Sequence, residues 1–280
     1  MWLNEENGSM LDGPFQGPMA FITDKKSNLW VGDSLNARVL AFDSKGRQGR
    51  EYDLASAAKE AGLASDPLLV DLVPSINGKL LAADVSNNAI LEIDARGGKA
   101  RAFTSQPAGS TFHWSQINKI HSDGKGRIYV EDVALRQTVM LDKDGKPELV
   151  LPGQIGIAVA EDGRLALIAA TEGEKQEWYV YTCEEPGKEL VKLARLNAEN
   201  PILWISLIGY DSQQKLHVVY DTELARHYIT LDSDGLLLKK STTVLHDPGY
   251  DVNRPDWLDK NGNIYTLQVR HPKLKILKLE

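Results

Sequence analysis

Cysteine is almost absent from this chain of 280 residues, which contains a single one, Cys183. A lone cysteine cannot form an internal disulfide or a cysteine-rich zinc site, so both kinds of framework are excluded. Residues 178–183 are rich in aromatic and β-branched side chains, which predicts a buried strand. We therefore expect the thiol to fill space in the core rather than to act as a nucleophile.

Long apolar runs are also missing. The longest uncharged apolar run, residues 201–210, is about half of the ~20 residues that a membrane-spanning helix needs, so no span is predicted. The first residues lack the basic region and apolar stretch of a signal peptide. We expect a soluble protein whose compartment stays open, since removal of a signal before residue 1 would make it secreted or periplasmic.

A surplus of basic charge is absent too. The chain has 32 Lys and Arg residues against 39 Asp and Glu residues, a formal net charge of −7. An acidic chain repels phosphate backbones at long range, and the one basic stretch, residues 270–278, is short. No nucleic-acid partner is expected.

Local catalytic motifs are lacking as well. The sequence has no Gly-x-Ser-x-Gly, no phosphate-binding glycine-rich loop that opens a helix, and no neighbouring Cys and His. His113 and His246 are far apart in the chain and show no metal-ligand spacing. The common nucleophile-based enzyme classes are therefore not indicated.

What the sequence does have is an internal repeat. A short apolar strand recurs six times at a mean spacing of 47 residues. These segments are residues 29–33, 80–84, 128–132, 165–169, 216–221 and 264–268. A further strand is predicted before each of them and another after it, the latter at 39–42, 90–93, 138–141, 179–181, 228–231 and 275–278.

Acidic-to-glycine turns follow the third strand, as in residues 43–46, 142–145 and 232–235. The first carboxylate caps such a turn, and the glycine takes the positive φ that a short hairpin connection requires. Each copy is therefore an antiparallel meander. A fourth strand follows in five copies, for example at 99–103, 148–151 and 236–244.

Four-stranded meanders repeated every 40 to 50 residues are typical of a β-propeller. We predict an all-β fold, a six-bladed β-propeller of four-stranded antiparallel blades, in one domain spanning residues 1–280. The predicted blades are approximately 17–54, 67–104, 115–151, 153–196, 201–245, and 254–280 plus 1–7. The sixth copy ends after its third strand, so we expect residues 2–7 to add the missing strand and close the ring.

One segment departs from the β pattern. Asp53 is a candidate N-cap, helix formers follow it, and Gly62 terminates the run, which together predict a two-turn helix. It is either an insertion without a role in binding or a lid.

Residues 28–43 resemble the NHL-repeat consensus, with Asp33 and Arg38 five residues apart, and Asp221 and Arg226 repeat this spacing. In the second and third copies, Ala89 and Gln137 stand where the arginine belongs. The resemblance implies a six-bladed ring, an architecture that hosts lyases, lactonases, esterases and pure binding scaffolds.

An aspartate also ends the second strand of four copies. We expect each of them to cap its own turn by accepting backbone N–H bonds. These residues are Asp33, Asp84, Asp132 and Asp221.

The candidate binding face follows from the predicted fold. In a propeller, the first strand of each blade lines the central channel, and one face carries the inter-blade loops together with the turns between second and third strands. The predicted ligand-binding residues of this loop face are His113, Trp114, Asn118, Trp204, His246, Tyr250 and Arg254. The leading hypothesis is an NHL-like propeller that binds a small molecule, a peptide or a partner protein there, without chemistry and without a cofactor.

A second resemblance supports the alternative. Gln16-Gly-Pro and Pro-Asp256 are similar to the Glu-Gly-Pro and Pro-Asp-Gly metal-ligand motifs of the gluconolactonase/regucalcin-like family, although Trp257 replaces the glycine. The resemblance implies a Ca²⁺ or other divalent metal site made of Gln16, Asn118 and Asp256, in a metal-dependent lactonase or esterase-type hydrolase. A third hypothesis, an NHL-type lyase with a zinc centre, would need several imidazoles, for which the sequence offers His113 and His246.

Overall fold

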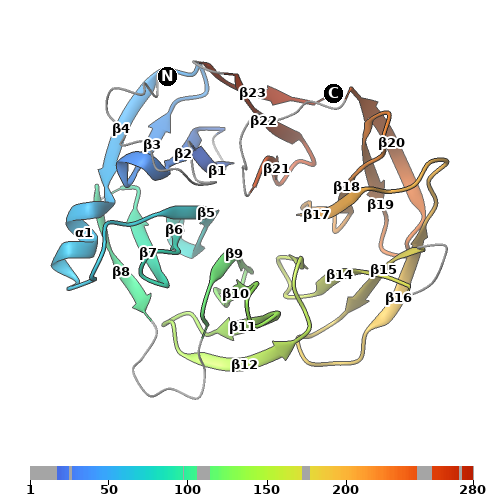
Figure 1. Cartoon of the computed structure of the whole chain (residues 1–280), viewed down its shortest axis with the longest axis horizontal. Helices are drawn as coiled ribbons and strands as arrows, with labels where there is room; N and C mark the ends of the chain where they lie inside the picture. The colour runs from blue at the N-terminus through green and yellow to red at the C-terminus, as the bar shows by residue number, and fades with distance from the viewer. Residues whose placement is uncertain are drawn as a thin grey trace.

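The computed structural model describes residues 18–24, 27–96, 98–105, 114–171, 177–244, 254–270 and 273–279. Their strands form six antiparallel sheets arranged radially around a central axis (Figure 1). Five sheets have four strands, and the sixth has three within the described residues. The predicted six-bladed propeller is therefore confirmed, whereas the strand predicted at residues 2–7 lies outside the described residues.

Each sheet is a meander in which consecutive strands pair. The first three blades comprise β1 (Pro18–Thr23), β2 (Leu29–Asp33), β3 (Arg38–Phe42) and β4 (Gln48–Asp53); β5 (Leu69–Pro74), β6 (Lys79–Asp84), β7 (Ala89–Asp94) and β8 (Lys99–Ser105); and β9 (Ile117–Ser122), β10 (Ile128–Asp132), β11 (Gln137–Leu141) and β12 (Pro147–Pro152).

The remaining blades follow the same order. They comprise β13 (Ala158–Val159), β14 (Leu165–Ala170), β15 (Trp178–Cys183) and β16 (Val191–Leu196); β17 (Trp204–Tyr210), β18 (Leu216–Asp221), β19 (Arg226–Leu231) and β20 (Leu237–Thr243); and β21 (Asp256–Leu258), β22 (Ile264–Arg270) and β23 (Lys273–Lys278). The repeated second strand of the sequence is thus β2, β6, β10, β14, β18 and β22.

The turn between β3 and β4 shows why the repeat folds locally. The Asp43 carboxylate accepts the backbone N–H groups of Lys45 and Arg47, each at 2.9 Å. Gly46 takes a φ of +75° and donates its N–H to the Asp43 carbonyl. Sequence-local hydrogen bonds therefore set this hairpin before any contact between blades.

The aspartates that end the second strands fall into two groups. Asp84 and Asp132 accept backbone N–H bonds from the turns that follow them, as predicted. The prediction is wrong for the other two, since the described contacts of Asp33 are with the side chains of Asn36 and Arg38, and those of Asp221 are with Arg226. Where an arginine stands five residues after the aspartate, its guanidinium group pairs with the carboxylate.

The core lies between neighbouring blades rather than within a single sheet. One buried cluster joins the first and second blades through residues such as Trp30 and Leu91, and another joins the third and fourth through Tyr129 and Leu165. Cys183 belongs to this second cluster and is 3% exposed, so its predicted place in the core is confirmed. Burial also raises the pKa of its thiol.

The first and last blades are in contact. Phe21 and Leu267 share a buried cluster, and the Trp257 indole N–H donates to Thr23 Oγ1 at 3.1 Å. The Arg254 N–H also donates to the Met19 carbonyl at 3.0 Å. The described strands therefore form a complete circle of blades (Figure 1).

Helix α1 (Leu54–Glu60) forms at the predicted place. Asp53 is its N-cap and accepts the Ser56 N–H at 3.1 Å, while Gly62 after the helix has a φ of +72°. The helix lies at the outer edge of the ring, beside β8 (Figure 1). None of its residues lines the pocket described below, which favours the insertion over the lid. No helix in the described part of the chain is long and apolar enough to cross a membrane.

Candidate functional site

A pocket of about 850 Å³ lies at the mouth of the central channel. First strands, the loops that enter them, the ends of second strands and the starts of third strands form its wall. Its described lining residues are Met19, Val70, Val85, Gln116, Ile117, Asn118, Lys119, Glu131, Val133, Ile155, Gly156, Ile168, Trp178, Leu203, Trp204, Ile205, Ser206, Asp221, Arg226 and Pro255. Asn118 and Trp204 are thus the predicted binding residues that the structure brings to this pocket.

The innermost strand of the fourth blade is unusually short. β13 has two residues, whereas β9 has six and β17 has seven. Its register pairs Ala158 with Ala166, so an extension of the strand would place Gly156 opposite Ile168. The segment leaves the sheet before that point.

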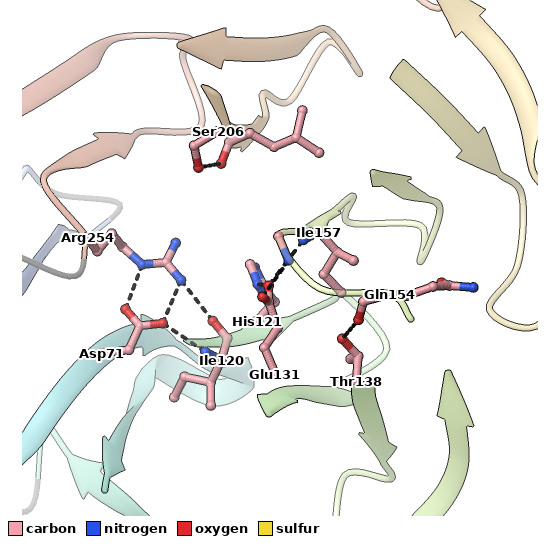
Figure 2. Close-up of polar contacts among 11 residues, drawn as sticks. Asp71, Ile120, His121, Glu131, Thr138, Gln154, Ile157, Ser206 and Arg254 are labelled. Atoms are coloured by element: carbon pink, nitrogen blue, oxygen red, sulfur yellow. Dashed lines mark hydrogen bonds and ion pairs between the residues drawn. The ribbon is translucent and has the colours of Figure 1, made fainter. Parts of the chain in front are cut away.

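Side chains of the third blade bind residues 154–157, the segment that leaves the fourth sheet before β13. The N–H groups of Gly156 and Ile157 donate to the Glu131 carboxylate at 2.6 and 3.2 Å, and Thr138 Oγ1 donates to the Gln154 carbonyl at 2.5 Å (Figure 2). These bonds replace the ladder bonds to β14 that the segment does not make.

The pocket extends outward as a result. Ile168 and Trp178 belong to the second and third strands of the fourth blade, yet both line the pocket. Ile155, Leu203 and Ile205 line it as well, so the side toward the fourth and fifth blades is apolar. The site therefore combines a polar part on the axis with an apolar extension.

A buried ion pair joins Arg254, at the start of the sixth blade, to Asp71 of β5 in the second blade. Arg254 Nε and one terminal nitrogen each lie 2.6 Å from an Asp71 carboxylate oxygen (Figure 2). Arg254 also donates to the Ile120 carbonyl, and the Ile120 N–H donates to Asp71 at 2.8 Å. Burial by itself would lower the pKa of Arg254. The charge of Asp71 and its hydrogen bonds to the guanidinium outweigh burial, so the pKa of Arg254 is raised. Arg254, predicted as a ligand-binding residue, thus ties the sixth blade to the second and third.

Glu131 is a second fully engaged carboxylate. His121 Nε2 lies 2.6 Å from its Oε1, in addition to the two backbone N–H groups already described (Figure 2). Burial favours the neutral acid, but the contact with His121 and the other hydrogen bonds outweigh it and lower the pKa of Glu131. The group therefore stays ionised and holds its partners.

Asp256 is buried beside Arg226. Arg226 makes a bidentate pair with Asp221 at 2.7 and 2.8 Å, and a further guanidinium nitrogen lies 3.6 Å from Asp256 Oδ2. Tyr228 donates its hydroxyl to Asp256 Oδ1 at 3.0 Å. Burial raises the pKa of Asp256, although Arg226 and the hydrogen bonds oppose the shift. The Arg226 guanidinium carbon lies 5.3 Å from the Trp204 ring centre, which fixes this aromatic residue at the pocket wall.

Lys119 differs from the other charged residues of the pocket. It lies on β9 opposite Glu131, and its side chain is partly exposed to the pocket. No described residue makes a hydrogen bond or ion pair with its ammonium group. Burial lowers the pKa of Lys119, while the charges of Glu131, Asp71 and Asp256 act at longer range to raise it.

The described residues do not fit a divalent metal. No cluster of three His, Cys, Asp or Glu side chains suitable for a metal is present among them. Asp71 is paired with Arg254 and Asp256 lies beside Arg226, so basic groups stand where a cation would have to bind. Of the implied ligands, Asn118 lines the pocket, Asp256 is 7% exposed, and Gln16 lies outside the described residues.

The other predicted site residues have different outcomes. Trp114 is 1% exposed and donates its indole N–H to the Asn88 carbonyl, so its ring is part of the core between the second and third blades. His113, His246 and Tyr250 lie outside the described residues.

Sequence reasoning did not single out several residues of the pocket, namely Lys119, Glu131, Ile168 and Trp178. The sequence could have indicated Lys119, because a lysine within a strand that lines the channel is expected to face a polar partner or ligand. No such signal existed for Ile168 and Trp178, which became part of the wall only because β13 is short.

The comparisons with known proteins show the fold alone. No protein-family model and no curated protein matches the chain. Similar solved structures include a gluconolactonase from Xanthomonas campestris (15% identity, TM-score 0.58, covering 95% of this chain and 88% of that one). Virginiamycin B lyase from Staphylococcus aureus is 12% identical (TM-score 0.53, 96% and 86%). The calcium-binding protein regucalcin from Agrobacterium tumefaciens is 11% identical (TM-score 0.55, 92% and 84%). These likenesses agree with a six-bladed propeller.

Proposed function

We propose that this protein binds a small organic molecule in the central pocket and carries out no chemistry on it. The observation that carries the proposal is the pocket itself, whose volume of about 850 Å³ falls within the range of small-molecule sites. Its wall is largely apolar, with a few polar groups near the axis, which is the usual composition of such sites.

The state of the ionisable groups supports binding rather than catalysis. Asp71 is committed to Arg254, and Glu131 to His121 and two backbone N–H groups. Among the described lining residues the one hydroxyl is that of Ser206, and its Oγ contacts the Leu207 carbonyl at 3.4 Å rather than a base. An activated nucleophile needs a base within hydrogen-bond reach.

The alternative remains a metal-dependent hydrolase of lactones or esters. It is supported by the fold shared with a gluconolactonase and by the position of Asn118 in the pocket wall. The pairing of Asp71 and Asp256 with basic groups counts against it.

The first experiment tests the pocket with N-phenyl-1-naphthylamine, a neutral dye that becomes fluorescent in apolar surroundings. We expect saturable binding to the wild-type chain and its loss in Ser206→Trp, which fills the pocket. Leu237→Trp adds the same side chain on the exposed outer strand β20 and should bind as the wild type does. Equal binding by both variants would refute the proposed site.

The second experiment separates binding from metal-dependent hydrolysis. A metal ion that binds only the native state adds roughly 2.7 kcal/mol of stability when its free concentration is about 100 times its Kd, and this shift is easily measured. We expect no rise in Tm with excess Ca²⁺, Mn²⁺ or Zn²⁺. A rise with one ion that disappears in Asp256→Ala would favour the hydrolase.

A further inference from the structure

Three basic side chains stand at or beside the described pocket, and two of them are in contact with a carboxylate. Arg254 is neutralised by Asp71, and Arg226 shares Asp221 and Asp256. Lys119 has no carboxylate oxygen of any described residue within 4.0 Å. It is therefore the cation of the described pocket that has no carboxylate in direct contact, and Glu131, Asp71 and Asp256 act on it only at longer range.

The nearest candidate counter-ion is occupied elsewhere. Glu131 stands opposite Lys119 in the β9–β10 register, but its carboxylate is turned to His121 and to the loop of the fourth blade (Figure 2). It cannot swing to Lys119 without leaving the N–H groups of Gly156 and Ile157 unpaired, which would cost about 1–3 kcal/mol for each group. The fold thus keeps the ammonium available.

A partly desolvated charge without a hydrogen-bonded ion pair is unfavourable, and a ligand of opposite charge in contact with it would reduce that cost. The apolar extension adds a second requirement. Ile168 and Trp178 line it, with Leu203 and Ile205 on the side of the fifth blade, so the rest of the ligand must be apolar.

Building on the proposed binding function, we propose that the ligand is a small organic anion, such as a carboxylate with an aromatic or aliphatic body. Its negative group pairs with the Lys119 ammonium, and its apolar body lies along Ile168 and Trp178. Arg226 and Arg254 do not compete for the anion, because each already has a carboxylate partner.

Two dyes with the same body and different charge test this proposal. 8-Anilinonaphthalene-1-sulfonate is the neutral dye N-phenyl-1-naphthylamine with one sulfonate added. We expect the wild-type chain to bind the anionic dye more tightly, and Lys119→Met to weaken that binding about tenfold, the effect of one charge-assisted contact. Lys119→Met should bind the neutral dye as the wild type does, and Lys119→Arg should restore most of the preference.

Lys239→Met is the matched control. It removes the same charge from the exposed outer strand β20, so it should leave the affinity for both dyes unchanged. An unaltered preference for the anionic dye in Lys119→Met, or an equal loss in Lys239→Met, would overturn the role of Lys119. If Ser206→Trp loses both dyes while Lys119→Met keeps both with unchanged affinity, the pocket binds ligands but Lys119 does not select anions. If the wild-type chain does not bind the neutral dye, the proposed binding function itself is refuted.

Discussion

At the scale of single residues, the aspartates that end four of the second strands show how one neighbouring residue changes which groups a carboxylate binds. Where Arg38 follows Asp33 by five residues, the two side chains pair at 2.8 Å. Where Gln137 takes the arginine position, Asp132 instead binds the N–H groups of its own turn and of Ser115. Both arrangements satisfy a buried carboxylate, so the position tolerates either solution.

Replacing Asp132 by alanine should lower the free energy of unfolding by about 1–3 kcal/mol, because the N–H groups of Ala134, Leu135 and Ser115 lose their acceptor. Asp132→Asn should lose less, since its amide oxygen can still accept from the turn. Urea unfolding checks both variants. Equal losses for the two would show that the hydrogen bonds of the turn are not the cause.

The buried His217 should make stability depend on pH. It is 4% exposed, and burial lowers its pKa despite a contact of 3.2 Å with Asp211. The folded chain therefore keeps this imidazole neutral at a pH where the unfolded chain protonates it, below the ordinary value of about 6.5. Since the unfolded state then binds more protons, stability falls as the pH drops below that value.

The measurement is the urea midpoint at pH 7.5 and pH 5.5 for the wild type and for His217→Gln. We expect the wild type to lose more stability on acidification than the variant, whose side chain does not titrate. The same loss in both would assign the pH dependence to other groups.

At the scale of elements, a hairpin turn can also pack against the neighbouring blade. The turn between β19 and β20 contains Gly235, which has a φ of +81°. A Cβ added there would lie within 2.3 Å of the Leu193 carbonyl oxygen of β16, in the neighbouring blade. The glycine of this turn therefore serves both local backbone geometry and close packing between blades.

A matched pair of variants separates these two requirements. Gly46 has a φ of +75° with nothing within 4 Å of an added Cβ, so Gly46→Ala should cost about 1–2 kcal/mol for the backbone conformation alone. Gly235→Ala should cost about 1–3 kcal/mol more, because the backbone of β16 must shift. Free energies of unfolding from urea titration check this, and equal costs would contradict the contact between blades.

At the scale of the whole molecule, the ring depends on the junction between its first and last blades. Trp257 and Leu267 of the sixth blade pack on the first, while β23 pairs within the described residues only with β22. An open edge on an outer strand is a place where a further strand can add.

Deleting residues 1–15, which leaves β1 intact, should lower the Tm by many degrees if residues 2–7 supply the missing fourth strand. Differential scanning calorimetry checks this, and a synthetic peptide of residues 1–15 added in trans should restore part of the loss. An unchanged Tm after the deletion would show that residues 2–7 do not supply a strand that stabilises the ring.

Much of the fold could be predicted from the sequence because its causes are local. The second strands β10 and β18 match the predicted residues 128–132 and 216–221 in both bounds, since strand patterning and Asp-to-Gly turns act over a few residues. The site could be predicted only in part. The face and two wall residues, Asn118 and Trp204, followed from propeller geometry.

By itself, the sequence determined the repeat, the meander within each blade, the helix after Asp53 and the absence of a cysteine framework. Only the tertiary structure decided which polar groups remain available. Arg254 meets Asp71 across 183 positions of the chain, and Glu131 draws Gly156 away from β14. Among the described residues, Lys119 therefore has no ion-pair partner beside the apolar extension. Such pairings depend on how blades face one another across the channel, and no pattern within a single repeat carries that information.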